Sequence, residues 1–152
     1  MKQNLILLAI IFVIGLSACT EDKSMDWKII NDHWAAVHAA DSGFVKTASG
    51  LQYKVNFPAW QYDPKPNVNS YVKVNYKGKL VDGTVFETNS GAWISLATAV
   101  SGWKEGITKM HLGSKYVFYI PSALGYGTST TNSAIPANSI LIFEVELLEI
   151  SN

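Results

Sequence analysis

A single helical pattern between Ser101 and Gly113 lies among segments whose apolar residues otherwise alternate. Trp103, Ile107 and Met110 recur at i, i+4 and i+7, so they share one face of a helix. Ser101 is suited to cap the first free amide groups, and Gly113 can end the helix in the left-handed conformation. One side of this helix must therefore be buried, with Trp103 between the helix and whatever covers it.

Most of the remaining chain between residues 51 and 150 favours β-strands, because its apolar side chains alternate with polar ones. The alternating apolar positions are Leu51, Tyr53, Val55 and Phe57, then Val72, Val74, Tyr76 and Leu80, and finally Leu141, Phe143, Val145 and Leu147. Shorter strands are expected at 84–87, 94–96 and 115–120, the first of them after an Asp82-Gly83 turn. The predicted fold class is therefore α+β, with a curved antiparallel sheet wrapped around one short central helix.

The charges and ligand-type side chains exclude several classes of function. All twelve basic residues are Lys, and the formal net charge is zero, so the planar guanidinium that suits nucleic-acid phosphates is missing. The three histidines, His33, His38 and His111, are scattered, and Cys19 is the only cysteine. We therefore expect no nucleic-acid partner, no metal site and no internal disulfide.

The amino terminus has the pattern of an export signal. Lys2 precedes an apolar run from Leu5 to Leu16 that is too short to span a bilayer easily, and Leu16-Ser17-Ala18-Cys19 follows. This resembles a bacterial lipoprotein signal, which implies cleavage before Cys19 and lipidation of that residue. An ordinary secretory signal is the alternative. Thr20 is unlike the Asp that retains some lipoproteins at an inner membrane, which favours an outer membrane and a periplasmic protein.

Removal of residues 1–18 leaves 11 Lys against 12 acidic residues, a net charge of −1. This charge is too weak to hold the protein on a membrane, so acyl chains on Cys19 would provide the attachment. We divide the chain into a signal peptide at 1–18, a lipid-anchored segment at 19–48 and a globular domain at 49–152. Surface display and the membrane leaflet are left open.

A second helix is predicted from Asp26 to Ala40. Trp27, Ile30, Trp34 and Val37 recur at helical spacing and form an apolar stripe. Packing on the domain is the simplest interpretation, and a dimer or partner face is the alternative.

No motif for covalent or metal chemistry is present, since the chain has no Gly-x-Ser-x-Gly, no phosphate-binding loop and no His-Glu-x-x-His. The segment from about Tyr71 to Ile150 instead resembles the FKBP-type peptidyl-prolyl cis-trans isomerases. The matching runs are Val72 to Phe86, Gly102-Trp103-Lys104-Glu105-Gly106, Leu124-Gly125-Tyr126-Gly127, Ile135-Pro136 and Phe143-Glu144-Val145-Glu146-Leu147. They stand in the family's order and cover about half of the chain.

The resemblance implies an apolar pocket for proline and no cofactor. It gives catalytic positions to Tyr76, Phe86, Glu87, Trp103, Tyr126 and Phe143, and substrate contacts to Ala99, Val100 and Ile135. Trp103 would form the pocket floor, while the Val100 amide and the Tyr126 hydroxyl would bind substrate carbonyls. Glu87 replaces the family's usual Asp, and Ala99 replaces a larger aliphatic residue.

Two activities follow from the resemblance, and the alternatives stay open at this point. The first is isomerisation of X-Pro bonds in exported proteins, with X-Pro-containing or unfolded polypeptides as partners. The second is a weakly active or inactive binding module for the same segments. The shortened stretch between Glu87 and Ile94 and the absence of Arg predict a wider pocket with reduced activity. A purely structural lipoprotein is a third reading.

Overall fold

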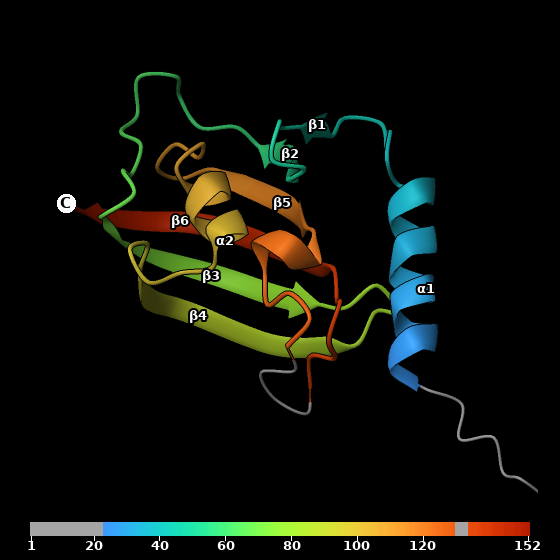
Figure 1. Cartoon of the computed structure of the whole chain (residues 1–152). Helices are drawn as coiled ribbons and strands as arrows, with labels where there is room; N and C mark the ends of the chain where they lie inside the picture. The colour runs from blue at the N-terminus through green and yellow to red at the C-terminus, as the bar shows by residue number, and fades with distance from the viewer. Residues whose placement is uncertain (1–22, 130–133) are drawn as a thin grey trace, which may run out of the picture.

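The computed structural model describes residues 23–129 and 134–152, which form one curved antiparallel sheet and two α-helices (Figure 1). The strands are β1 (Val45–Lys46), β2 (Gln52–Phe57), β3 (Tyr71–Lys79), β4 (Val85–Ser95), β5 (Lys115–Ile120) and β6 (Leu141–Ser151), and the helices are α1 (Lys23–Val37) and α2 (Ser101–Ile107). The strand order is β1-β2-β5-β6-β3-β4, with every neighbouring pair antiparallel. This is the α+β architecture expected from the sequence.

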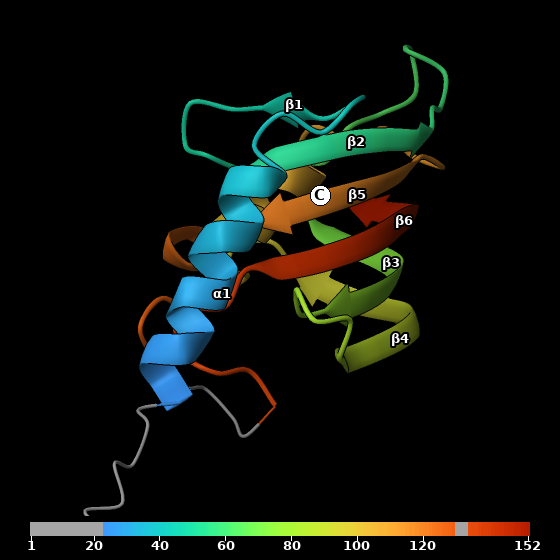
Figure 2. The same cartoon turned by 90° about the vertical axis from the view of Figure 1, so that its right-hand side faces the viewer.

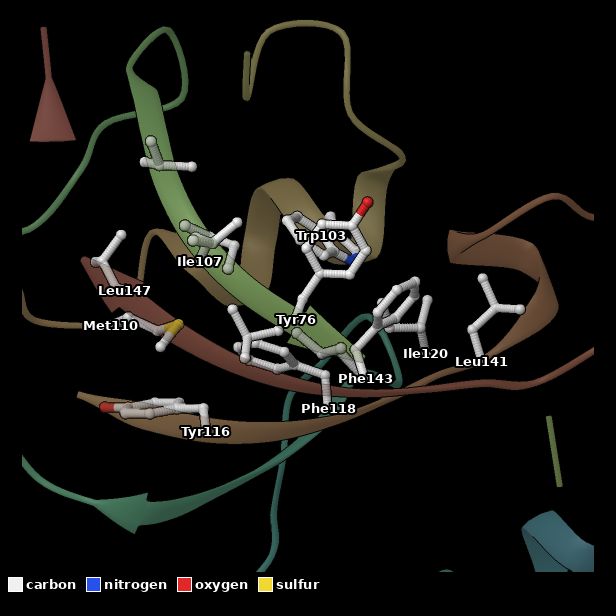
Figure 3. Packing of buried hydrophobic residues seen from close by; sticks show 14 of the residues in the cluster. Tyr76, Trp103, Ile107, Met110, Tyr116, Phe118, Ile120, Leu141, Phe143 and Leu147 are labelled. Carbon is white, nitrogen blue, oxygen red and sulfur yellow. The ribbon is translucent and has the colours of Figure 1, made fainter. Parts of the chain in front are cut away.

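Helix α2 lies against one face of the sheet, and its apolar stripe forms the centre of the core (Figure 3). Trp103 is 5% exposed, while Ile107 and Met110 are fully buried, as their spacing predicts. The helix is close to the sheet because two of its residues are glycines. A Cβ added at Gly102 would lie 2.4 Å from Cγ2 of Ile120.

The predicted end and cap of this helix are wrong. The helix ends at Ile107, and Met110 belongs to a following turn. Ser101 is the first helical residue and makes no capping bond, because Val100 stands at the cap position. Gly113 does adopt a positive φ of 82°, but in the turn that leads into β5.

The alternation in the central strands β3 and β6 is confirmed. Val72 and Val74 of β3 and Leu141 and Leu147 of β6 are fully buried. The alternation in β2 is not maintained, because the polar Gln52 is only 8% exposed, while Val55 and Phe57 are 41% and 57% exposed. Strand β1 pairs with the first two residues of β2 alone, and a bulge follows Val55, so the second half of β2 is an exposed sheet edge.

Strand β4 is a single element where the sequence favours two short ones. It runs from Val85 to Ser95 and pairs with β3 along most of its length. Bulges opposite Val74–Tyr76 and Gly78–Lys79 of β3 shift the register. These bulges interrupt the period of two, which explains why the sequence pattern is broken in this stretch.

Helix α1 stands at one end of the sheet, beside the ends of β5 and β6 (Figures 1 and 2). It begins and ends three residues earlier than the predicted range 26–40. Only part of the predicted stripe faces the domain: Trp27 and Trp34 are half-buried, whereas Ile30 and Val37 are 49% and 61% exposed. Asn31 is buried in their place, because it accepts a hydrogen bond from the backbone of Ile140, directly before β6.

The predictions for the signal peptide, for Cys19 and for Thr20 lie outside the described residues. Within the described ranges, no helix is both long and apolar enough to cross a bilayer. The sheet includes β1, which precedes residue 49, at which we place the start of the domain. The division of the chain into three parts stays a prediction.

Candidate functional site

A hollow of about 240 Å³ opens where α2 faces β3, β4 and β6. Its walls come from five separate parts of the chain, so it exists only once the sheet has closed over the helix. The lining residues are Tyr76 of β3, Glu87 and Ile94 of β4, Thr98, Ala99 and Val100 before α2, Trp103 of α2, Tyr126, and Phe143 of β6. We call it the aromatic hollow.

Three rings are fixed around the base of the aromatic hollow (Figure 3). The ring centre of Trp103 lies 5.2 Å from that of Tyr76 and 5.2 Å from that of Phe143, with interplanar angles of 84° and 87°. Such edge-to-face contacts are favoured by the charge distribution of aromatic rings. The buried Nε1–H of Trp103 finds no hydrogen-bond partner among the described residues. Ring packing therefore holds the indole in place.

Tyr76 and Glu87 form the polar edge of the aromatic hollow. The Tyr76 hydroxyl donates a hydrogen bond to Oε1 of Glu87. Burial and the neighbouring carboxylate raise the pKa of Tyr76 above its ordinary value of 10.0. Tyr76 therefore stays protonated at neutral pH. One carboxylate oxygen of Glu87 is occupied by the hydrogen bond from the Tyr76 hydroxyl.

The segment before α2 and the turn after β5 supply the other predicted contacts. Ala99 and Val100 precede the helix directly, and Val100 takes an extended conformation with φ −58° and ψ 151°. Tyr126 follows a 3-10 turn at Ser122–Leu124, which begins after Pro121 ends β5. The structure therefore brings both predicted carbonyl-binding residues to the same hollow, while their bonding roles stay predictions.

Two predicted pocket residues do not line the aromatic hollow. Phe86 places its ring 5.5 Å from that of Phe143, on the side of Gly78, whose missing side chain leaves room for it. Ile135 is 4% exposed and belongs to the core. Conversely, Ile94 and Thr98 line the hollow and were not predicted. The predicted apolar strand at Ile94, leading directly to Trp103, was the signal for the first of them.

A larger hollow of about 430 Å³ lies on the opposite face of the sheet, but its side chains mostly satisfy one another. Asn75 donates a hydrogen bond to Glu146 at 2.9 Å, and Lys115 lies 3.0 Å from the same carboxylate. These two partners lower the pKa of Glu146. Glu144 forms an ion pair with Lys79. This surface is a solvated sheet face with paired charges, and the aromatic hollow is the better candidate site.

Metal-ligating side chains are not grouped in the part of the chain that the structure describes: no three His, Cys, Asp or Glu residues there could share an ion. The chemistry of the aromatic hollow is that of apolar rings with a few hydrogen-bonding groups.

Comparison with known proteins identifies this arrangement. The sequence model of the FKBP-type peptidyl-prolyl cis-trans isomerases matches residues 63–148, more than half of the chain. The chain belongs to this family. The matched range contains all nine residues that we predicted for the site, and it leaves α1, β1 and β2 outside.

Two relatives extend the FKBP match toward the amino terminus. The chain is 41% identical over 123 residues to the "FKBP-type peptidyl-prolyl cis-trans isomerase FkpA" of Aeromonas hydrophila, covering 78% of this chain and 45% of that protein. It is 30% identical over 138 residues to the "Outer membrane protein MIP" of Legionella longbeachae, covering 88% and 58%. The chain spans about half the length of these relatives.

A solved FKBP-family structure supports the fold itself. The crystal structure of a peptidyl-prolyl cis-trans isomerase from Pseudomonas syringae pv. tomato superposes with a TM-score of 0.78 at 29% identity. The match covers 85% of this chain and 96% of that one. The expected fold class is therefore confirmed.

Proposed function

We propose that this protein is a peptidyl-prolyl cis-trans isomerase that rotates X-Pro bonds in exported polypeptides. The observation that carries the proposal is the aromatic hollow, in which Tyr76 and Phe143 stand edge-on to the indole of Trp103. Its volume of about 240 Å³ suits one proline ring with its flanking peptide groups. Membership of the isomerase family supports the same activity.

Such a hollow can catalyse the reaction without a nucleophile. Rotation of an X-Pro bond is slow because amide resonance must be broken, at a cost of about 18–20 kcal/mol for a peptide bond. The planar amide is more polar than the twisted transition state. An apolar, water-poor site therefore destabilises the planar ground state more than it destabilises the transition state. Each ~1.4 kcal/mol of this difference accelerates rotation about tenfold.

We assign a role to each part of the hollow. Trp103 supports the proline ring, with Phe143 beside it, and Phe86 holds Phe143 from the other side. The Val100 amide and the Tyr126 hydroxyl hold the carbonyls on one side of the bond, which leaves the other side free to turn. Ala99 contacts the substrate at the edge of the hollow.

A weakly active or inactive binding module is the second candidate. Trp60 and Tyr62 are 80% and 88% exposed on the Pro-rich loop after β2, which favours contacts with unfolded polypeptides. Ala99 leaves less apolar contact at the edge of the hollow than a larger side chain would. In this reading, the hollow grips proline segments with little turnover.

An isomerisation assay coupled to proteolysis of an X-Pro peptide separates the two candidates. We expect acceleration by the wild-type protein and a loss of activity in Tyr126→Phe, which removes only one hydroxyl. Tyr71→Phe is the matched control, because it removes a hydroxyl from an exposed position of β3 outside the hollow, and it should keep full activity. Peptide binding without acceleration would leave only the binding module, whereas full activity of Tyr126→Phe would refute the assigned role.

We further propose that the protein is attached to a membrane of the cell envelope through lipid on Cys19, with the domain in the periplasm. The Leu16-Ser17-Ala18-Cys19 sequence supports this, and so does the name of the Legionella longbeachae relative, "Outer membrane protein MIP". Cys19→Ser should move the protein from the membrane pellet to the soluble fraction. Continued pelleting of this variant would count against lipidation.

A further inference from the structure

The segment at 97–100, which we call the connecting segment, joins β4 to α2 and forms one wall of the aromatic hollow (Figure 1). Thr98, Ala99 and Val100 line the hollow, and the Val100 amide is the group predicted to hold a substrate carbonyl. The conformation of the connecting segment therefore decides where this amide points.

Apolar packing fixes the connecting segment only from outside its two ends. Leu96, directly before it, is fully buried, and Trp103, in the first turn of α2, is 5% exposed. Between them, Ala97 and Thr98 are exposed, so burial does little to hold their backbone in place. The order of this part of the wall therefore depends on hydrogen bonds.

Lys104 of α2 bonds to both ends of the connecting segment. Its backbone N–H donates to the carbonyl of Val100 at 3.0 Å, as expected at the start of a helix. Its side-chain Nζ donates to the carbonyl of Ala97 at 3.1 Å, seven positions earlier in the chain. The N–H and the hydroxyl of Thr98 add longer bonds, both of 3.3 Å, but to Ser95 of β4. Lys104 thus ties the connecting segment to the helix that carries the pocket floor.

We propose that Lys104 is a positioning residue for the isomerisation reaction, because its ammonium group fixes the connecting segment and with it the Val100 amide. A peptide unit is planar, so a carbonyl that rotates turns the following N–H with it and displaces the backbone beyond. The bond from Nζ holds the Ala97 carbonyl toward α2 and limits this rotation. Lys104 does not line the aromatic hollow, so it acts on the substrate only through the connecting segment. This inference rests on the proposed isomerase function.

Steady-state kinetics of X-Pro peptide isomerisation test this role. Lys104→Met keeps most of the stem and removes the ammonium donor. The Val100 amide holds a carbonyl on the side of the bond that does not turn, so its displacement should weaken ground-state and transition-state binding alike. We expect KM to rise about fivefold, which converts to ~1 kcal/mol, with kcat changed less than about twofold. Partial unfolding would instead lower kcat at unchanged KM, because fewer molecules would be active.

Two variants and a change of salt serve as controls. Lys104→Arg keeps a cationic donor and should restore the wild-type KM. Lys77→Met removes an ammonium group from an exposed position of β3 outside the aromatic hollow, and it should leave KM unchanged. A hydrogen bond that orders the connecting segment should matter equally at low salt and at about 1 M NaCl. A charge that merely attracts the peptide would lose its effect at the higher concentration.

Three outcomes would overturn the proposal: an unchanged KM in Lys104→Met, a difference that disappears at high salt, or a Lys104→Arg variant that behaves like Lys104→Met. If the wild-type protein shows no turnover, the isomerase proposal fails instead. The positioning role is then tested by ¹⁵N relaxation of the amides of Thr98, Ala99 and Val100. Lower order parameters in Lys104→Met than in the wild type would support the role, and equal ones would refute it.

Discussion

The side-chain oxygen of Asn31 in α1 accepts a hydrogen bond from the backbone N–H of Ile140 at 2.8 Å, across 109 positions of sequence. The amide nitrogen of Asn31 donates in turn to the carbonyl of Trp27 at 2.8 Å. Trp27 donates from Nε1 to the hydroxyl of Ser139 at 2.9 Å. Two side chains of α1 thus tie the helix to the segment that leads into β6.

Asn31→Ala should destabilise the domain, because it leaves the buried Ile140 N–H unpaired. The expected loss is about 1–3 kcal/mol in the free energy of unfolding, measured by urea denaturation. His33→Ala is the matched control, since His33 is exposed on the same helix, and it should change stability little. Equal stability of both variants would mean that the hydrogen bond between Asn31 and Ile140 adds nothing to the stability of the domain.

Gly102→Ala should also destabilise, although Ala is intrinsically the better helix former by ~1 kcal/mol. The new Cβ would lie 2.4 Å from Cγ2 of Ile120, so α2 or the strand must shift. We expect a loss of about 1–3 kcal/mol, typical of an overpacked core. The test is thermal unfolding of a double-mutant cycle with Ile120→Ala. If the clash is the cause, Gly102→Ala should cost less in the Ile120→Ala background.

The pair of Tyr76 and Glu87 should act as a unit in catalysis. Tyr76→Phe and Glu87→Gln each weaken the hydrogen bond between them, so each should lower kcat/KM. The double variant should lose less than the two single losses combined, with a coupling of at least ~0.5 kcal/mol. Additive losses in the isomerisation assay would show that the two residues act independently.

Stability should fall at alkaline pH. Burial raises the pKa of Tyr76, Tyr116 and Tyr119 above the ordinary value of 10.0, helped for Tyr119 by the carboxylate of Asp41. Below pH 10 these tyrosines are protonated in both states, so their full contribution is present. As pH rises further, the unfolded chain loses its protons first, and this contribution is lost at up to ~1.4 kcal/mol per pH unit and group.

Urea denaturation between pH 8 and pH 11 measures this effect. Tyr116→Phe should reduce the slope of the unfolding free energy above pH 10, because one raised pKa is removed. Tyr71→Phe, on the exposed side of β3, should leave the slope nearly unchanged. A free energy of unfolding that does not change above pH 10 would contradict the prediction.

The sequence predicted the central elements well, because each has a strong pattern of its own. The alternation of Val72, Val74 and Tyr76 identified β3, and the bounds of β5 agree with the expected 115–120. The buried face of α2 followed from Trp103 and Ile107 alone. The family resemblance predicted nine site residues, and seven of them line the aromatic hollow.

The failures occur where burial depends on a distant partner. The stripe on α1 predicted Ile30 and Val37 inside, yet Asn31 is buried because it meets Ile140. Val55 and Phe57 continue the alternation of β2, but their neighbour β1 is too short to cover them. Phe86 packs edge-on against Phe143, which lines the hollow, so its own role in the site stays a prediction.

Local sequence patterns are enough to predict the order of strands and helices, the apolar side of each central element and the residues of the isomerase family. Period and spacing determine them, since backbone geometry fixes which side chains share a face. The burial of Gln52, the tie between Asn31 and Ile140 and the closing of the aromatic hollow are decided only by the tertiary structure. Each of these requires contacts between residues far apart in sequence, and no local pattern indicates which residues will make them.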